Sequence, residues 1–133
     1  MDITTTHEQG RVPVTVFHLK GDLNVNTYEQ LEQTAHKAVE GGARNVLLDL
    51  AEVPYVSSAG IRAVNHIFQL LRGDAPGESD AAIEKGLRAG TFKSPHVKLL
   101  NPTPRVAEVL KVAGVDMFLE IHHDLKSAVA SFG

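Results

Sequence analysis

The sequence predicts an α/β fold, with about four helices on a mainly parallel, mixed sheet of about four or five strands. Apolar runs of strand length alternate with segments of helical period, and such alternation requires crossover connections between parallel strands. One run, "NVLLDLAEV", is almost continuously apolar, which is typical of a strand buried on both faces. The chain has 133 residues, 43% of them hydrophobic, so we expect a single domain over 1–133.

Two strands open the chain, over 2–8 and 12–19. They are rich in β-branched residues, and Gln9-Gly10 between them predicts a turn, so we expect the two strands to pair antiparallel. Pro13 has no amide hydrogen to donate, which suits the start of a strand.

A helix follows over 26–42. Asn26 or Thr27 can cap its start, and Gly41-Gly42 ends it. Its apolar positions return at helical spacing and form one face: Tyr28, Leu31, Ala35, Ala38 and Val39.

The buried strand over 45–53 ends at Pro54, and a second helix is predicted over 58–72. Apolar residues recur there at helical spacing in a stripe made of Ile61, Val64, Ile67, Phe68 and Leu71.

The C-terminal part repeats the alternation of strand and helix. Thr103 and Asp124 are the expected helix caps, with Pro104 at the first helical position and Gly114 at the end of that helix. The predicted elements are a strand over 96–101, a helix over 103–114, a strand over 117–122 and a helix over 124–132.

An insert over 73–95 interrupts this rhythm, since a helix and the next strand are usually about 2–6 residues apart. It begins with turn residues and contains a possible short helix over 79–90, followed by Phe92 and Lys93. A surface loop is the simpler interpretation, and an element that binds a partner or shields a dimer surface is the other.

Composition excludes several classes of protein. The net charge of -3, without a basic stripe, argues against nucleic acid as a partner. The absence of cysteine excludes disulfides and thiolate zinc sites and fits a cytoplasmic protein. No apolar run approaches the roughly 20 residues needed to span a bilayer, and the N-terminus does not resemble a secretion signal.

The stretch "PYVSSAGIRAV" places two serines where a strand gives way to a helix. A nucleophile elbow would need glycine at position 56, which is Val56, and His66 lies about 12 Å along the same helix from Ser58, so a hydrolase is not expected. The stretch has no lysine for a phosphate-binding loop. Ser57 or Ser58 is therefore first of all a candidate helix cap.

The histidines do not form a metal-ligand pattern. His122 and His123 are adjacent, so on a strand they would point to opposite faces, while His18, His36 and His96 are isolated in sequence. We expect solvated or core-edge histidines and no bound metal or cofactor.

Two segments resemble motifs of the STAS domain, a family named for sulfate transporters and anti-sigma-factor antagonists. "NVLLDLAEVPYVSSAGIRAV" resembles its buried strand followed by Asp-Ser-Ser/Thr-Gly-Leu at a helix start, and "GDLNVNT" resembles its earlier Gly-Glu-Leu-Asp-x-x-Thr motif. The helix "PRVAEVLKVAGV" and the order of the elements are also similar outside the insert. The resemblance implies a STAS-like single domain.

The resemblance also implies a non-enzymatic function. Antagonist members bind an anti-sigma factor, often a serine kinase, which switches them off by phosphorylating the serine that corresponds to Ser58; a phosphatase would reverse this. Ser57 is the second candidate for phosphorylation. The expected partner-binding residues are Asp22, Asn24, Thr27, Tyr55, Ser57, Ser58, Ala59, Gly60 and Arg62.

The motifs depart from the family pattern at five positions. Ser57 replaces the family's Asp, Ala59 its second Ser/Thr and Arg62 a glycine. In the earlier motif, Asp22 replaces Glu and Asn24 replaces Asp. The site thereby loses acidic charge and gains a cation that can form a charge-assisted bond to a phosphate on Ser58 or select a different partner.

Other functions remain open beside a phosphorylated antagonist that is a monomer or weak dimer. One is a STAS scaffold that is not phosphorylated, and another is a soluble subunit that docks on an ABC-type transport complex without entering the membrane. A nucleotide- or lipid-sensing module is a third, although no residue of the sequence supports it.

Overall fold

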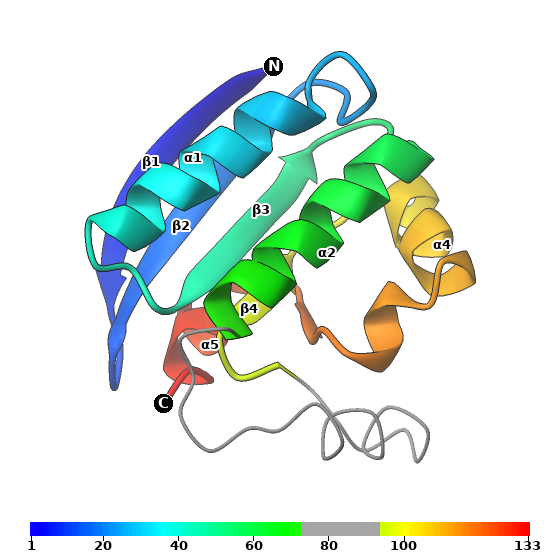
Figure 1. Ribbon diagram of the computed structural model, residues 1–133. Coiled ribbons are helices and arrows are strands. Elements are labelled where there is room, and N and C mark those ends of the chain that lie inside the picture. The colour runs from blue at the N-terminus through cyan, green and yellow to red at the C-terminus, as the bar shows by residue number, and fades with distance from the viewer. Residues whose placement is uncertain (73–93) are drawn as a thin grey trace, which may run out of the picture.

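A computed structural model describes residues 1–72 and 94–133, and its elements follow the predicted order (Figure 1). The sheet has five strands in the order β1-β2-β3-β4-β5: β1 (Asp2–Gln9), β2 (Pro13–Lys20), β3 (Val46–Glu52), β4 (Val97–Leu100) and β5 (Ile121–His122). The described helices are α1 (Tyr28–Glu40), α2 (Ser58–Arg72), α4 (Pro104–Val112) and α5 (Leu125–Ala130), with a 3-10 helix η1 (Val115–Met117) after α4.

The strand pairing confirms the predicted mixed, mainly parallel sheet. β1 and β2 are antiparallel, whereas β2, β3, β4 and β5 pair in parallel. The hairpin turn lies at the predicted Gly10, where a Cβ atom would be only 2.8 Å from the Val129 carbonyl oxygen of α5. A glycine is needed there because the turn packs directly against that helix.

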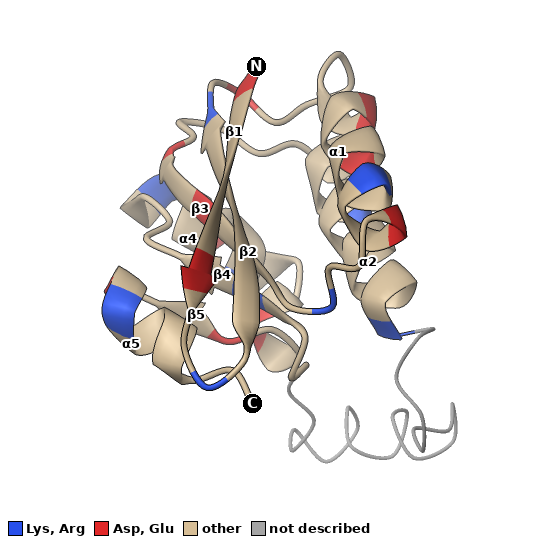
Figure 2. Ribbon diagram, turned by 90° about the vertical axis from the view of Figure 1, so that its left-hand side faces the viewer, with Lys and Arg blue, Asp and Glu red and all other residues tan. Residues whose placement is uncertain are grey.

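Helices cover both faces of the sheet, and Figure 2 shows α1 and α2 on one side and α5 on the other. The larger cluster of buried side chains includes residues of α1, α2 and α4. The smaller cluster joins Val14, Val16, Leu47 and Leu100 of the strands to Ala128, Val129 and Phe132 at the C-terminus. In β3, Leu47 belongs to the smaller cluster and its neighbour Leu48 to the larger one, so this strand is buried on both faces as predicted.

Most predicted helix ends are confirmed. The Thr103 hydroxyl accepts a hydrogen bond from the Val106 amide at 3.2 Å, and the Asp124 carboxylate accepts one from the Ser127 amide at 2.8 Å. The expectation for α1 was wrong in its mechanism. Thr27 precedes the helix, but its hydroxyl makes no cap bond and turns back to the loop before it.

The predicted strand over 117–122 is wrong for most of its length. Gly114 adopts a left-handed conformation with φ 78°, and the chain then forms η1 before β5 begins at Ile121. Val115 and Leu119, four residues apart, are both buried while Met117 is exposed, so the segment buries its apolar residues with helical spacing.

The possible helix over 79–90, with Phe92 and Lys93, lies outside the described residues. The last part of the predicted insert belongs to the fold. Ser94 is buried, and its hydroxyl accepts hydrogen bonds from the amides of His96 and Val97, both at 3.2 Å, at the start of β4. No helix within 1–72 or 94–133 has the length and apolar character needed to cross a bilayer.

Candidate functional site

The structure joins the two sequence motifs into one surface. Leu23 and Val56 form a parallel β-bridge. The Leu23 amide donates to the Tyr55 carbonyl at 2.9 Å, and the Ser57 amide donates to the Leu23 carbonyl at 2.9 Å. The loop before α1 and the loop before α2 are thus held side by side at the ends of β2 and β3.

Gly60 allows this close approach. A Cβ atom at position 60 would lie 2.7 Å from the Leu23 carbonyl oxygen and 2.9 Å from side-chain carbons of Leu23 and Val56. Those distances leave no room for any side chain, so the glycine of the serine motif is required by the packing of the other motif.

The loop before α1 is ordered by its own polar side chains. The Asn24 side-chain oxygen accepts from the Asn26 amide at 2.9 Å. The Thr27 hydroxyl donates to the Asp22 carbonyl at 2.8 Å and accepts from the Asn24 amide at 2.9 Å. These bonds fix the backbone, so that Asp22 and Val25 stand exposed to solvent.

The two serines have different environments. Ser57 precedes α2, and its hydroxyl accepts a hydrogen bond from the Gly60 amide at 3.4 Å, which makes Ser57 the capping residue. Ser58 is the first residue of α2 and its side chain is exposed. The first turn of α2 contains no acidic residue, so nothing in this turn offsets the positive end of the helix dipole.

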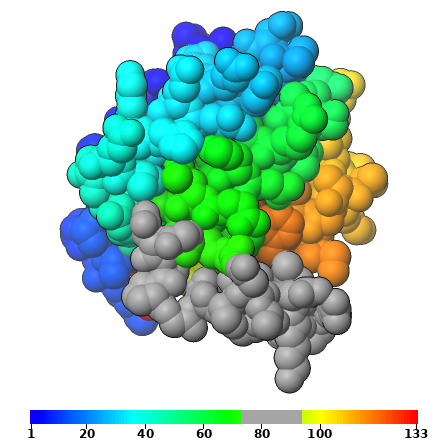
Figure 3. Space-filling model, viewed as in Figure 1, coloured from blue at the N-terminus to red at the C-terminus, as the bar shows by residue number. Residues whose placement is uncertain are grey.

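An apolar groove of about 500 Å³ runs from Ser58 along α2 to α4. Its lining consists of Ser58, Ile61 and Arg62 of α2, of Glu108, Val109 and Val112 of α4, and of Ala113, which directly follows α4. Val112 is 80% exposed. In Figure 3 the surface of α2 lies between those of α1 and α4.

A second contact ties α4 to the serine loop. The Arg105 guanidinium lies over the Tyr55 ring, with its central carbon 5.8 Å from the ring centroid. Tyr55 remains 42% exposed. At the start of α1, the Tyr28 hydroxyl donates to a Glu29 carboxylate oxygen at 3.2 Å, and this bond and the charge of Glu29 raise the pKa of Tyr28.

The expected partner-binding residues fall into three groups in the structure. Exposed residues that face solvent are Asp22, Tyr55, Ser58 and Arg62. Half-buried residues that organise the loops are Asn24, Thr27 and Ser57. Ala59 and Gly60 are buried, so they shape the site through packing and are not part of its exposed surface.

Sequence reasoning did not identify the α4 side of the groove. The buried residues of α4 are Val106 and Leu110, whereas Val109 and Val112 form a second apolar pair three residues apart on another side of the helix. That second pair, of which Val112 is exposed, is the signal that was available, because apolar residues on a second side of a core helix can mark an interaction surface.

His18, His36 and His66 make polar contacts of their own. His18 Nδ1 is 2.7 Å from an Asp49 carboxylate oxygen, and its Nε2 is 2.9 Å from the Thr6 hydroxyl. The Nε2 atoms of His36 and His66 lie 2.7 Å apart between exposed side chains of α1 and α2. Within the two described ranges, no group of three or more potential ligands could hold a metal ion.

Comparison with known proteins finds a matching family and a related protein. The model of the STAS domain family matches residues 4–74. A protein named as an anti-sigma factor antagonist, BtrV of Bordetella bronchiseptica, is 30% identical over 114 residues, which cover 86% of this chain and 82% of BtrV.

Solved structures have the same fold. A STAS domain protein of Planctomyces limnophilus superposes with a TM-score of 0.67 at 23% identity, covering 97% of this chain and 96% of that one. SpoIIAA, an anti-sigma factor antagonist in its unphosphorylated form, superposes with a TM-score of 0.66 at 18% identity, covering 95% and 93% of the two chains. The family match, the relative and the shared fold agree with the joined motifs, and the chain belongs to the STAS domain family.

Proposed function

We propose that this chain is an anti-sigma factor antagonist, which binds an anti-sigma factor of the serine kinase type and is switched off by phosphorylation at Ser58. The relative BtrV is named as an anti-sigma factor antagonist, and SpoIIAA has been solved in both unphosphorylated and phosphorylated forms. The observation that carries the proposal is the exposed Ser58 side chain at the start of α2, where it lines an apolar groove.

The unmodified surface suits a protein partner. The groove is lined mainly by Ile61, Val109, Val112 and Ala113, with one cation, Arg62, and one anion, Glu108, on opposite helices. An apolar centre with a charged margin is the usual pattern of a protein interface. Tyr55, exposed beside Arg105, adds an aromatic residue of the kind that dominates binding energy.

Phosphorylation would change the surface without unfolding the domain. A phosphate on Ser58 adds about -1.5 to -2 charges at the positive end of α2, where the first amide groups and the helix dipole stabilise an anion. Arg62 lies one turn further along α2 and can pair with it. If a partner fills the groove with an apolar side chain, the phosphate must lose its water or clash with that side chain. Either effect weakens the complex.

Ser57 in place of the family's aspartate fits this mechanism. Its hydroxyl caps α2 without adding a negative charge beside the phosphate. The serine therefore keeps the helix start ordered in both states, while the switching charge comes from Ser58 alone.

The direct test is phosphorylation by an anti-sigma factor kinase of the source organism with ATP, followed by mass spectrometry of the peptide that contains both serines. We expect one phosphate on the wild type and on Ser57→Ala, and none on Ser58→Ala. Labelling of Ser58→Ala to the wild-type level would disprove the switch at this position. Binding without any labelling would leave an antagonist scaffold that is not phosphorylated.

The binding surface has its own test. Ser58→Asp is expected to weaken the complex with the anti-sigma factor by at least about tenfold, since a charge at the edge of an interface must be desolvated. Ser58→Ala should bind as the wild type does. Thermal unfolding of both variants should match the wild type, and a folding defect in Ser58→Asp would assign the serine a purely structural role.

A further inference from the structure

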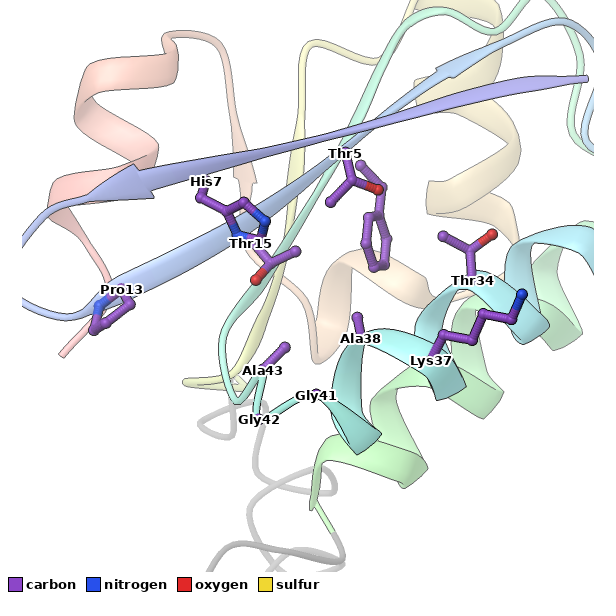
Figure 4. Close-up of a pocket in the computed structure, with 11 residues that line it drawn as sticks. Thr5, His7, Pro13, Thr15, Thr34, Lys37, Ala38, Gly41, Gly42 and Ala43 are labelled. Carbon is purple, nitrogen blue, oxygen red and sulfur yellow. The ribbon is translucent and has the colours of Figure 1, made fainter.

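A second cavity lies near the other end of α1, away from the serine surface. It measures about 560 Å³ and sits between the β1–β2 pair and the C-terminal turns of α1 (Figure 4). Residues of three segments line it: Thr5, His7, Pro13, Thr15 and Phe17 of the hairpin, Thr34, Lys37 and Ala38 of α1, and Gly41, Gly42 and Ala43 of the turn that follows. This volume falls within the range of small-molecule sites.

The register of the hairpin builds one wall of the cavity. His7 lies directly opposite Thr15, and Thr5 directly opposite Phe17, so four neighbouring side chains of β1 and β2 share this face of the sheet. Pairing within an eight-residue antiparallel ladder holds these side chains in place, so this wall exists before any ligand arrives.

The chemistry of the lining is one-sided. It contains one ammonium group, one imidazole and three threonine hydroxyls, and no carboxylate. The Thr34 hydroxyl is used by the helix, since it donates to the Gln30 carbonyl at 2.8 Å. Lys37 is exposed at the opening, where its flexible side chain can turn toward a bound group.

Thr15 supplies a polar group to the wall of the cavity. The residue is only 7% exposed, and within residues 1–72 and 94–133 its hydroxyl makes no hydrogen bond. In Figure 4 this hydroxyl points from β2 toward the turn at Ala43, across the cavity. The cavity leaves this hydroxyl open to water, so it is not a buried group without a partner, and a ligand atom in the cavity could take the place of that water.

We propose that this cavity binds a small organic anion, a carboxylate or a phosphate monoester with an apolar body. Lys37 attracts the anionic head, and the Thr15 hydroxyl donates a hydrogen bond to it. The apolar body lies against Ala38, Ala43 and Pro13. The site is separate from the Ser58 surface, so it would let the protein respond to a metabolite as well as to a kinase.

The test uses three probes that share an aromatic ring and differ in their head group: benzoate, phenyl phosphate and neutral benzyl alcohol. Each is titrated to low-millimolar concentration, as expected for ligands of this size, while backbone amide signals are followed by NMR. We expect at least one of the anions to shift the amide signals of Thr15, Ala38, Gly41 and Gly42. That anion should bind at least about tenfold more tightly than benzyl alcohol. The tighter of the two anions identifies the head group.

Two variants assign the binding to these residues. Thr15→Val keeps the shape and removes the hydroxyl, and Lys37→Gln removes the charge; each is expected to weaken binding of the better anion by about three- to tenfold. Lys111→Gln is the matched control, because Lys111 is also an exposed lysine in the last turn of a helix. The proposal is wrong if neither anion shifts these amides, if benzyl alcohol binds equally well, or if the Lys37 and Lys111 variants behave alike. The probes contain no protein partner, so failure here leaves the proposed antagonist function untouched.

Discussion

Replacing Gly60 by alanine adds one methyl group at the point where the two motif loops meet α2. The new carbon would lie 2.7 Å from the Leu23 carbonyl oxygen and 2.9 Å from the side chains of Leu23 and Val56. The oxygen cannot turn away freely, because it accepts a hydrogen bond from the Ser57 amide at 2.9 Å. Relief therefore requires the loop over 21–27 to move away from the helix.

Three contributions determine the change in the free energy of unfolding. Alanine in place of glycine favours a helix by about 1 kcal/mol. Overpacking against this contact costs about 1–3 kcal/mol. Weakening the two hydrogen bonds of the Leu23–Val56 bridge costs up to about 1 kcal/mol each. The steric and hydrogen-bond costs dominate, and we expect a net destabilisation of about 2 kcal/mol.

Urea unfolding followed by circular dichroism measures this change. The matched control is Gly41→Ala, since Gly41 has φ -80° and a Cβ atom there would lie at an ordinary 3.5 Å from the nearest carbonyl oxygens. That variant should be as stable as the wild type or up to about 1 kcal/mol more stable. If Gly60→Ala proves as stable as Gly41→Ala, the reasoning is refuted, because residue 60 would then not be in close contact with Leu23.

Further predictions concern the opposite face of the sheet and the C-terminal helix. Lys98 is buried, and its ammonium donates to the Ser131 carbonyl at 3.1 Å and to the Ser131 hydroxyl at 3.0 Å. Lys98→Ala should therefore lower the free energy of unfolding in urea by about 3 kcal/mol. Replacing the exposed Lys111 by alanine should change it by less than about 0.5 kcal/mol. Asp49→Ala removes the bonds to His18 and to the Ala51 amide and should cost about 1–2 kcal/mol; an unchanged unfolding midpoint would mean that these bonds contribute nothing. The hydrogen bonds from Ser127 hold the pKa of Asp124 below its ordinary value of 3.8, so its stabilisation is complete above that value and is lost as the pH falls through the lowered pKa. The unfolding midpoint of Asp124→Asn should therefore decline less steeply than that of the wild type on acidification, and parallel curves would refute the assignment.

The order of the elements could be predicted because periodicity is a local property. In 58–72 the apolar stripe predicted α2, and in 45–53 the continuous apolar run predicted a strand with two buried faces; both are confirmed. The segment after Gly114 failed because three consecutive apolar residues fit either a strand or a helical turn. The choice was made by burial of Leu119 in the larger apolar cluster, a tertiary effect that no local pattern encodes.

The candidate site divides in the same way. Ser58 and the loop before α1 could be found from motifs, since each motif is continuous in sequence. The groove could not, because Val109 and Val112 become part of one surface with Ser58 only when α4 packs beside α2. Asn24 and Thr27 were found from the motif as partner-binding residues, but their side chains hold the loop. The residues that this loop leaves at the surface are Asp22 and Val25.

The unequal covering of the sheet has a consequence for the order in which the protein opens. The short helix α5 rests on the smaller of the two apolar clusters, whereas the two helices that frame the groove belong to the larger one. Opening of α5 alone should thus occur at a lower free energy than global unfolding, as a separate cooperative unit. The backbone amides of α5 would exchange with deuterium early, while those of α2 stay protected. The C-terminal end can loosen without loss of the partner surface.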